Sequence, residues 1–266
     1  MPSINGVFYH VEIYGSGVPL VLLHGFTGSS ENWLPLAGAV SESYQLIAPD
    51  LLGHGITDSP PLPERYRMEN VGQDIIGILQ QITTEPAHLL GYSMGGRLAL
   101  YLAAVYPHFF RSLILESASP GLESPEARQE RIASDEQLAQ RIESEGVEKF
   151  VVYWGKNPLF ATQKNLPENI RTQLHHQRLK NNPIGLANSL RGMGTGVQPS
   201  LWNQLRDIQL HVLLITGELD TKFTQIGKAM GEKLPKGEHV IVPDAGHTIH
   251  LEQPDNFARI VLKFLG

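Results

Sequence analysis

The sequence predicts an α/β fold in which a mainly parallel sheet is flanked by helices and carries an inserted helical cap. Short apolar runs rich in Val, Ile and Leu alternate with amphipathic stretches, a pattern typical of parallel strands joined by helices. The strand pattern stops between residues 117 and 210, where the chain is charged, helical in pattern and interrupted by prolines, and it then returns. A chain of 266 residues fits one domain with such an insertion. We therefore expect a core made of residues 1–116 and 211–266, with residues 117–210 as a cap over the sheet.

Each expected strand is a short apolar run bounded by turn residues, and each expected helix is an amphipathic stretch. The strands are predicted near residues 7–14, 18–24, 44–49, 87–92, 111–116, 211–216 and 238–242. The helices of the core are predicted near residues 31–41, 67–82, 94–106, 222–233 and 254–265. The last of these begins at Pro254, a residue that suits the first turn of a helix.

Composition excludes several classes of partner. The formal charge of −6 comes without a basic tail or a Lys/Arg run, so nucleic acid is not expected to bind. No apolar run approaches the length of about 18 residues that spans a bilayer, and the first residues lack the pattern of a secretory signal. Without cysteine the chain has no disulfide framework, thiolate nucleophile or thiolate-bound metal. We expect a cytoplasmic protein with no membrane partner, either a monomer or a weak oligomer.

Ser93 is the candidate nucleophile, because it lies between an apolar strand run and a helical pattern. In a nucleophile elbow, the sharp and strained turn requires small residues two positions before and two positions after the serine. Gly91 and Gly95 meet this requirement. The turn would also place Ser93 at the start of a helix, where the positive end of the helix dipole favours developing negative charge. Taken alone, the segment could also be an ordinary glycine-rich turn.

A nucleophilic serine needs a base, and the base needs an acid that orients it. Asp220 follows one predicted strand and His247 follows the next, in the chain order Ser, Asp, His that this type of site uses. Since the carboxyl ends of parallel strands meet at one edge of a sheet, the three residues can converge. Glu218 and Asp244 are competing acids, but the first lies too near the strand end and the second only three residues before His247.

Two other histidines compete with His247 for the role of base. His250 follows it by nearly one helical turn and is better explained as a supporting, partly buried residue. His54, between two glycines, is better explained as a residue that orders a loop, although it could line the entrance of the site.

An oxyanion hole requires two backbone N–H groups, one from the residue after the nucleophile and one from an early loop. Met94 is the residue after Ser93. The early loop is His24-Gly25-Phe26, directly after a predicted strand, and we expect the N–H of Phe26 to be the second donor.

With these motifs the sequence resembles the α/β-hydrolase superfamily over nearly its whole length. The resembling segments follow the chain in order: His24-Gly25-Phe26, Asp50 to Gly55, Gly91 to Gly96, Gly217 to Asp220, and Ala245-Gly246-His247. This resemblance implies an α/β-hydrolase fold. It does not specify the reaction, because the same fold carries esterases, carbon-carbon bond hydrolases, dehalogenases and lyases.

Arg97 indicates an anionic substrate. It lies four residues after Ser93, on the same face of the predicted helix, so its guanidinium can point back beside the reactive serine. A planar guanidinium matches a carboxylate in a bidentate way, whereas an ester pocket has little use for a cation.

The cap contains further arginines for which two interpretations stay open. Arg128 and Arg178 are candidates for capture of an anion over the pocket. Arg131 and Arg141 are better explained as solvated surface residues paired with neighbouring glutamates. Two aromatic residues of the cap either line the pocket or form the core of the cap: Trp154 and Phe160.

These additional residues resemble one family, the synthases of 2-succinyl-6-hydroxy-2,4-cyclohexadiene-1-carboxylate (SHCHC). The segments that carry the resemblance are His24 to Gly28, Gly91 to Arg97, Pro120 to Leu122 with Arg128 and Arg131, Pro158 to Ala161, Arg178 before Asn181 and Asn182, Val197 to Pro199, Asp220 to Phe223, and Gly246-His247. The resemblance implies a lyase that eliminates pyruvate from 2-succinyl-5-enolpyruvyl-6-hydroxy-3-cyclohexene-1-carboxylate in menaquinone or phylloquinone biosynthesis. It also implies substrate-binding roles for Arg97, Arg128, Arg178, Tyr92 and Trp154, since the substrate carries three carboxylates. The sequence departs from the family at Leu52, where proline is usual, outside the expected chemistry.

The mechanism implied by this resemblance uses a hydrolase triad without hydrolysis. His247, held by Asp220, would take the proton of Ser93, and Ser93 Oγ would abstract the ring proton next to the succinyl carbonyl. The N–H groups of Phe26 and Met94 would hold the enolate. No metal or organic cofactor is expected. A carboxylesterase or carbon-carbon bond hydrolase is the main alternative, and a non-catalytic binding protein is disfavoured because binding alone has no use for all three residues of a triad.

Overall fold

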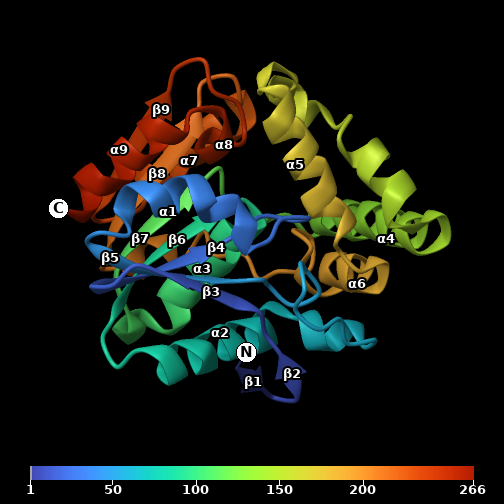
Figure 1. The fold of residues 1–266 in the computed structure, drawn as a ribbon, viewed down its shortest axis with the longest axis horizontal. Coiled ribbons are helices and arrows are strands. Elements are labelled where there is room, and N and C mark those ends of the chain that lie inside the picture. Colours follow the sequence, from blue (N-terminus) through green and yellow to red (C-terminus); the bar gives the residue numbers. More distant parts are fainter. Residues whose placement is uncertain (1) are drawn as a thin grey trace.

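The computed structural model describes residues 2–266, and its centre is a twisted seven-stranded sheet (Figure 1). The strands lie in the order β3 (Val11–Tyr14), β5 (Tyr44–Pro49), β4 (Val18–Leu23), β6 (Ala87–Tyr92), β7 (Phe110–Glu116), β8 (His211–Gly217) and β9 (Gly237–Val242). Only the pairing of β3 with β5 is antiparallel among these described strands, and the other neighbours pair in parallel. The predicted fold class is confirmed.

The run predicted as one strand near residues 7–14 is broken, and that prediction was wrong in this detail. β2 (Val7–Phe8) pairs with β1 (Ser3–Ile4) in a separate small sheet, and β3 begins only at Val11. Tyr9 lies at the break, fully buried, and its hydroxyl donates a hydrogen bond of 2.5 Å to Asp74 Oδ2. Because the Tyr9 ring is buried here, the backbone around it does not continue the strand pairing from β2 into β3.

Helices cover both faces of the sheet, as the alternation along β4 requires. Leu20 and Leu22 point into the core on the side of α1 (Leu34–Val40) and α9 (Pro254–Leu265). Val21 and Leu23 point into the opposite core. Successive side chains of a strand face opposite sides, so a wholly apolar strand indicates a sheet buried on both faces. The helices on the second face are α2 (Met68–Ile82), α3 (Met94–Val105) and α7 (Thr221–Gly231).

The stretch between β7 and β8 is helical within the described residues (Figure 1). It contains α4 (Pro125–Trp154), the short 3-10 helix η4 (Pro158–Asn165), α5 (Glu168–Leu179) and α6 (Pro183–Met193). The backbone of α4 bends at Gly146, where φ is 81°, and α4 packs on α6 around Phe150 and Leu186. None of the helices in residues 2–266 is both long enough and apolar enough to cross a membrane. The division into core and cap at residues 117 and 210 stays a prediction.

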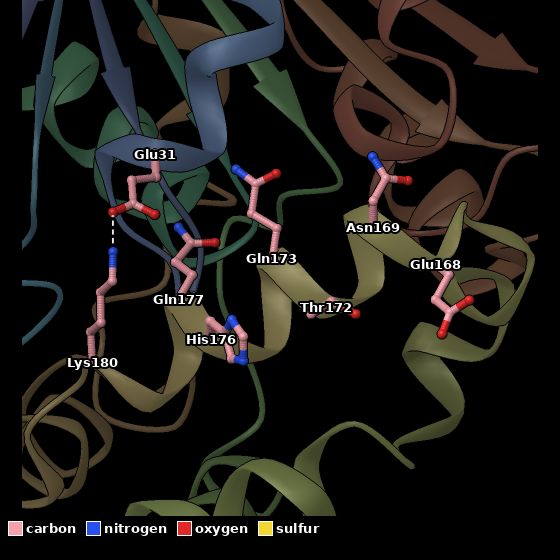
Figure 2. Close-up of a pocket in the computed structure, with 8 residues that line it drawn as sticks. All are labelled: Glu31, Glu168, Asn169, Thr172, Gln173, His176, Gln177 and Lys180. Carbon is pink, nitrogen blue, oxygen red and sulfur yellow. Dashed lines mark hydrogen bonds and ion pairs between the residues drawn. The ribbon is translucent and has the colours of Figure 1, made fainter.

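The C-terminal end of α5 is attached to the core at the 3-10 helix η1 (Ser30–Trp33). Gln177 Nε2 donates to Ser29 Oγ at 2.6 Å and to Asn32 Oδ1 at 2.9 Å. The Lys180 ammonium pairs with the Glu31 carboxylate, as Figure 2 shows. An open pocket runs along α5 from this attachment and is lined by Glu31, Glu168, Asn169, Thr172, Gln173, His176, Gln177 and Lys180. The cap is therefore held to η1 by a buried amide and an exposed ion pair.

Candidate active site

Ser93 forms the turn between β6 and α3 in a strained conformation, with φ of 51° and ψ of −108°. The flanking glycines are required by close packing of backbone atoms. A Cβ on Gly91 would lie 2.4 Å from the carbonyl oxygen of Gly95, and a Cβ on Gly95 would lie 2.2 Å from that of Leu23. These distances are far below van der Waals contact, so both positions admit only glycine while the turn keeps this shape.

His247 bridges Ser93 and Asp220. Its Nε2 lies 3.1 Å from Ser93 Oγ, and its Nδ1 lies 2.6 Å from Asp220 Oδ2. The imidazole is buried, and this network assigns the proton to Nδ1, which leaves Nε2 to accept from the serine hydroxyl. The two competing acids are exposed, and the Glu218 carboxylate accepts a hydrogen bond from the backbone N–H of Asp244 at 3.2 Å.

Asp220 is held by the start of α7 as well as by the histidine. Its Oδ1 accepts a hydrogen bond from the Phe223 N–H at 3.3 Å and so caps the helix. The same carboxylate thus ends the β8–α7 turn and orients the imidazole.

The rival histidines do not contact Ser93. His250 Nδ1 bonds to Glu116 Oε2 at 2.8 Å, and its ring packs against Trp33. His54 is fully buried, and burial lowers its pKa to about 3, so its ring is neutral at physiological pH. Both are therefore supporting residues of the buried core around the site.

The loop after β4 lies directly against the elbow. A Cβ on Gly25 would lie 2.5 Å from Tyr92 Cε1 and 3.5 Å from Ser93 Cβ. Within residues 2–266 the N–H of Phe26, the next residue, has no hydrogen-bond acceptor. Met94 is the first residue of α3, and the first N–H groups of a helix have no acceptor within the helix. Neither predicted donor therefore has a hydrogen-bond acceptor among the described residues, and the two segments that carry them meet at the elbow.

A cleft of about 810 Å³ lies between the elbow and the cap. Tyr92, Trp154 and Phe160 line it, together with both predicted oxyanion donors. The Tyr92 hydroxyl bonds to Thr248 Oγ1 at 3.1 Å, and burial raises its pKa well above the ordinary value, so it stays protonated. Trp154 and Phe160 meet edge to face at 5.7 Å, and Trp154 also packs on the core of the cap. Trp154 therefore both lines the cleft and packs on the hydrophobic cluster of the cap, whereas Phe160 lines the cleft and packs on Trp154.

Arg97 reaches the cleft from α3. Its Nη1 donates to the carbonyl oxygen of Met193 at 2.8 Å and to Gln198 Oε1. Burial, aided by the positive charge of Arg131, lowers the pKa of Arg97 to about 10, which leaves the guanidinium charged at neutral pH. A fixed cation therefore lies one helical turn from the nucleophile.

Arg178 lies behind the lining of the cleft. Its Nη2 donates to Gln163 Oε1 at 3.1 Å, and its guanidinium carbon is 5.3 Å from the centre of the Phe160 ring. Burial lowers its pKa below the ordinary value. Phe160 lines the cleft and Arg178 does not, so the expected contact of Arg178 with the substrate stays a prediction.

Arg128 is not among the residues that line the cleft, and its expected contact with the substrate stays a prediction. Its Nε and Nη2 donate to the carbonyl oxygens of Gly196 and Val197 at 3.0 and 3.1 Å. Arg131 lines the cleft instead, and its partner is Asp135 at 2.8 Å rather than a glutamate. Three residues turn a helix by about 300°, so the two arginines point about 60° apart, and only the packing of α4 decides which faces the serine.

Two further charged residues line the cleft and were given no role from the sequence. Lys222 follows Asp220 by two residues and is exposed at the start of α7. Asp135 is buried and faces both Arg97 and Arg131. The position of Lys222, two residues after the triad acid Asp220, could have indicated a place in the site. The sequence around Asp135, in contrast, does not distinguish it from the other acidic residues of α4. Arg141 also lines the cleft, but it pairs with Glu145 as expected.

Comparisons with known proteins show the family and the fold of this chain. The family model described as "alpha/beta hydrolase fold" matches residues 18–254. The chain is 47% identical over 263 residues to a protein of Bacillus subtilis (strain 168) named putative 2-succinyl-6-hydroxy-2,4-cyclohexadiene-1-carboxylate synthase, covering 98% of this chain and 96% of that protein. It is 32% identical to the synthase of the same name from Serratia proteamaculans (strain 568), covering 92% of each. The solved structure of MenH from S. aureus superposes with a TM-score of 0.92 at 36% identity, covering 96% of this chain and 97% of that one.

Proposed function

The chain belongs to the α/β-hydrolase fold family and, within it, to the SHCHC synthases, and from this premise we propose that it is a carbon-oxygen lyase. It eliminates pyruvate from 2-succinyl-5-enolpyruvyl-6-hydroxy-3-cyclohexene-1-carboxylate and forms SHCHC, a step toward menaquinone or phylloquinone. The observation that carries the proposal is a hydrogen-bonded Ser93, His247 and Asp220 in a cleft that Arg97 and Arg131 also line.

The reaction begins with removal of a ring proton. His247 Nε2 accepts the proton of Ser93 Oγ, and Asp220 stabilises the imidazolium that forms. Ser93 Oγ then takes the acidic proton of the ring carbon next to the succinyl carbonyl. The serine is a base here, so no acyl-enzyme forms.

The enolate then expels the leaving group. The N–H groups of Phe26 and Met94 hold the enolate oxygen, in the role of an oxyanion hole. The electron pair moves through the ring, a new carbon-carbon double bond forms and the bond to the enolpyruvyl oxygen breaks. His247 returns its proton to that oxygen, and the enol converts to pyruvate.

The charged side chains of the cleft select a polycarboxylate. Arg97, Arg131 and the exposed Lys222 line the cleft and supply its positive charges. Tyr92 and Trp154 line the same cleft and would contact the cyclohexene ring.

The test is pyruvate release from freshly generated substrate, followed with lactate dehydrogenase, for the native protein and the Ser93→Ala and Arg97→Ala variants. Because the substrate decays spontaneously, the quantity to compare is the acceleration over buffer. We expect rapid release that the serine variant loses entirely and the arginine variant largely loses. No acceleration by folded native protein, together with turnover of small activated esters, would show a carboxylesterase or carbon-carbon bond hydrolase instead.

A further inference from the structure

Asp135 is a buried carboxylate in which only one of the two oxygens has a hydrogen-bond partner among the described residues. Its side chain is 5% exposed and comes from α4. Oδ1 accepts a hydrogen bond from Arg131 Nε at 2.8 Å, whereas Oδ2 has no hydrogen-bond partner among residues 2–266. Oδ2 lies against Gly194, where an added Cβ would be 2.5 Å away, and both residues line the cleft of Ser93. A buried carboxylate oxygen without a donor is costly, so its retention at this place calls for a role.

The charges that face Asp135 are positive. Arg131 faces it from α4 and Arg97 from α3. The nearest arginine of α6, Arg191, is engaged with Glu136 and Glu143. The segment 194–198 contributes no titratable side chain. Burial raises the pKa of Asp135, while Arg131 and, less strongly, Arg97 oppose that shift. The carboxylate is thus the counter-charge of the two cleft arginines.

We propose that Asp135 balances Arg97 and Arg131 while the cleft is empty and takes up a proton from solvent on Oδ2 when a carboxylate of the substrate or product binds there. This inference rests on the proposed function. A second carboxylate in a shared buried space disfavours the ionised form of the first, and the bound ligand supplies that second carboxylate. Proton uptake removes the repulsion, leaves both arginines for the ligand, and keeps Oδ1 as the acceptor of Arg131 Nε. No bond of the ligand forms or breaks in this step.

A proton taken up on binding makes affinity depend on pH. Where the empty site is ionised and the occupied site is protonated, the dissociation constant rises up to about tenfold for each pH unit, because one proton is linked to one ligand. Asparagine has the shape of a protonated aspartic acid and cannot titrate. In Asp135→Asn the dissociation constant therefore should rise less between pH 6 and pH 8 than in the native protein, by up to about tenfold for each pH unit.

The experiment is titration calorimetry with SHCHC, the product, in two buffers of different ionisation enthalpy between pH 6 and 8. We expect the native protein to take up about one proton per ligand more than Asp135→Asn does. Taking this difference removes the protons exchanged by groups that are common to both proteins. The matched control is Glu136→Gln, which changes the neighbouring carboxylate bonded to Arg191 and should leave uptake as in the native protein.

Thermal unfolding shows whether each variant is folded before it is titrated. Asp135→Glu, which restores a titratable group, should restore proton uptake. Binding without proton uptake, or equal uptake in the native protein and Asp135→Asn, would overturn the inference while leaving the proposed function intact. If the native protein does not bind SHCHC at all, the proposed function and the inference both fail.

Discussion

Arg128 and Arg131 provide a direct test of the site, because they lie three residues apart on α4 but make different contacts: Arg131 lines the cleft, and Arg128 bonds to backbone carbonyl oxygens. In Arg131→Ala the cleft loses a guanidinium whose Nε is held by Asp135, leaving its terminal nitrogens for a substrate carboxylate. In Arg128→Ala the cleft loses nothing, but two backbone carbonyl oxygens lose their donors. The first change should affect catalysis, and the second should affect stability.

The magnitudes follow from the exposure of each group. A hydrogen bond to a charged group contributes about 1.5–3 kcal/mol, which corresponds to about a 10- to 150-fold change in kcat/KM. The Arg131 side chain is 41% exposed, so solvent screening places the loss in the lower part of that range, about 10- to 50-fold. For Arg128→Ala we expect kcat/KM within about twofold of the native value and a free energy of unfolding lower by about 1–3 kcal/mol.

The assay is initial-rate pyruvate release at several substrate concentrations, with denaturant unfolding of the same preparations. Each variant is the control for the other, since both remove an arginine from the same helix. A larger loss of kcat/KM in Arg128→Ala than in Arg131→Ala would refute the assignment of Arg131 to the substrate site.

Three further predictions concern stability. Burial lowers the pKa of His24 from 6.5 to about 4, so its contribution to the free energy of unfolding is fully present above pH 6.5 and is lost as the pH falls toward 4. Acidification from pH 7 to pH 4 should therefore lower the free energy of unfolding by about 3 kcal/mol through this group. Denaturant unfolding at the two pH values should show a smaller loss in His24→Gln than in the native protein. Gly95→Ala should lower the free energy of unfolding by more than about 3 kcal/mol because its Cβ meets a carbonyl oxygen, whereas Gly38→Ala, with open space in α1, should raise thermal stability slightly; equal melting temperatures would contradict the elbow packing. Gln177→Leu should destabilise by about 1–3 kcal/mol, since it leaves Ser29 and Asn32 without their buried partner, and Lys180→Ala by less than about 1 kcal/mol; thermal melts that reverse this order would disprove the account of the attachment.

The parts of the site that could be predicted from the sequence are those fixed by local backbone geometry. Ser93 needs glycines on both sides whatever the rest of the fold does, and Asp220 and His247 follow strands whose carboxyl ends must meet. The fold class follows in the same way from strands that are apolar on both faces.

The parts that could not be predicted depend on how a helix is rotated against its neighbours. Arg128 and Arg131 have similar sequence surroundings. Arg131 lines the cleft, whereas Arg128 donates to the backbone of residues 196–197, and this difference depends on how α4 packs. The electrostatic surroundings of Asp135 include Arg97, which lies on another helix, and no sequence pattern within α4 predicts that these two residues face each other. Likewise, the burial of Tyr9 against Asp74 breaks a strand run that alternation alone predicts as continuous.

The chain order of the triad has a consequence for the protein while it is being made. Ser93 and His247 are 154 residues apart, with the whole helical stretch between β7 and β8 in that interval. At about 5–20 residues per second, a ribosome needs roughly 8–30 s to travel from one to the other. During this time Ser93 exists without its base, so no group is in place to accept the proton of its hydroxyl. Activity therefore begins only once the segment after β9, which carries His247, has emerged and packed against the elbow.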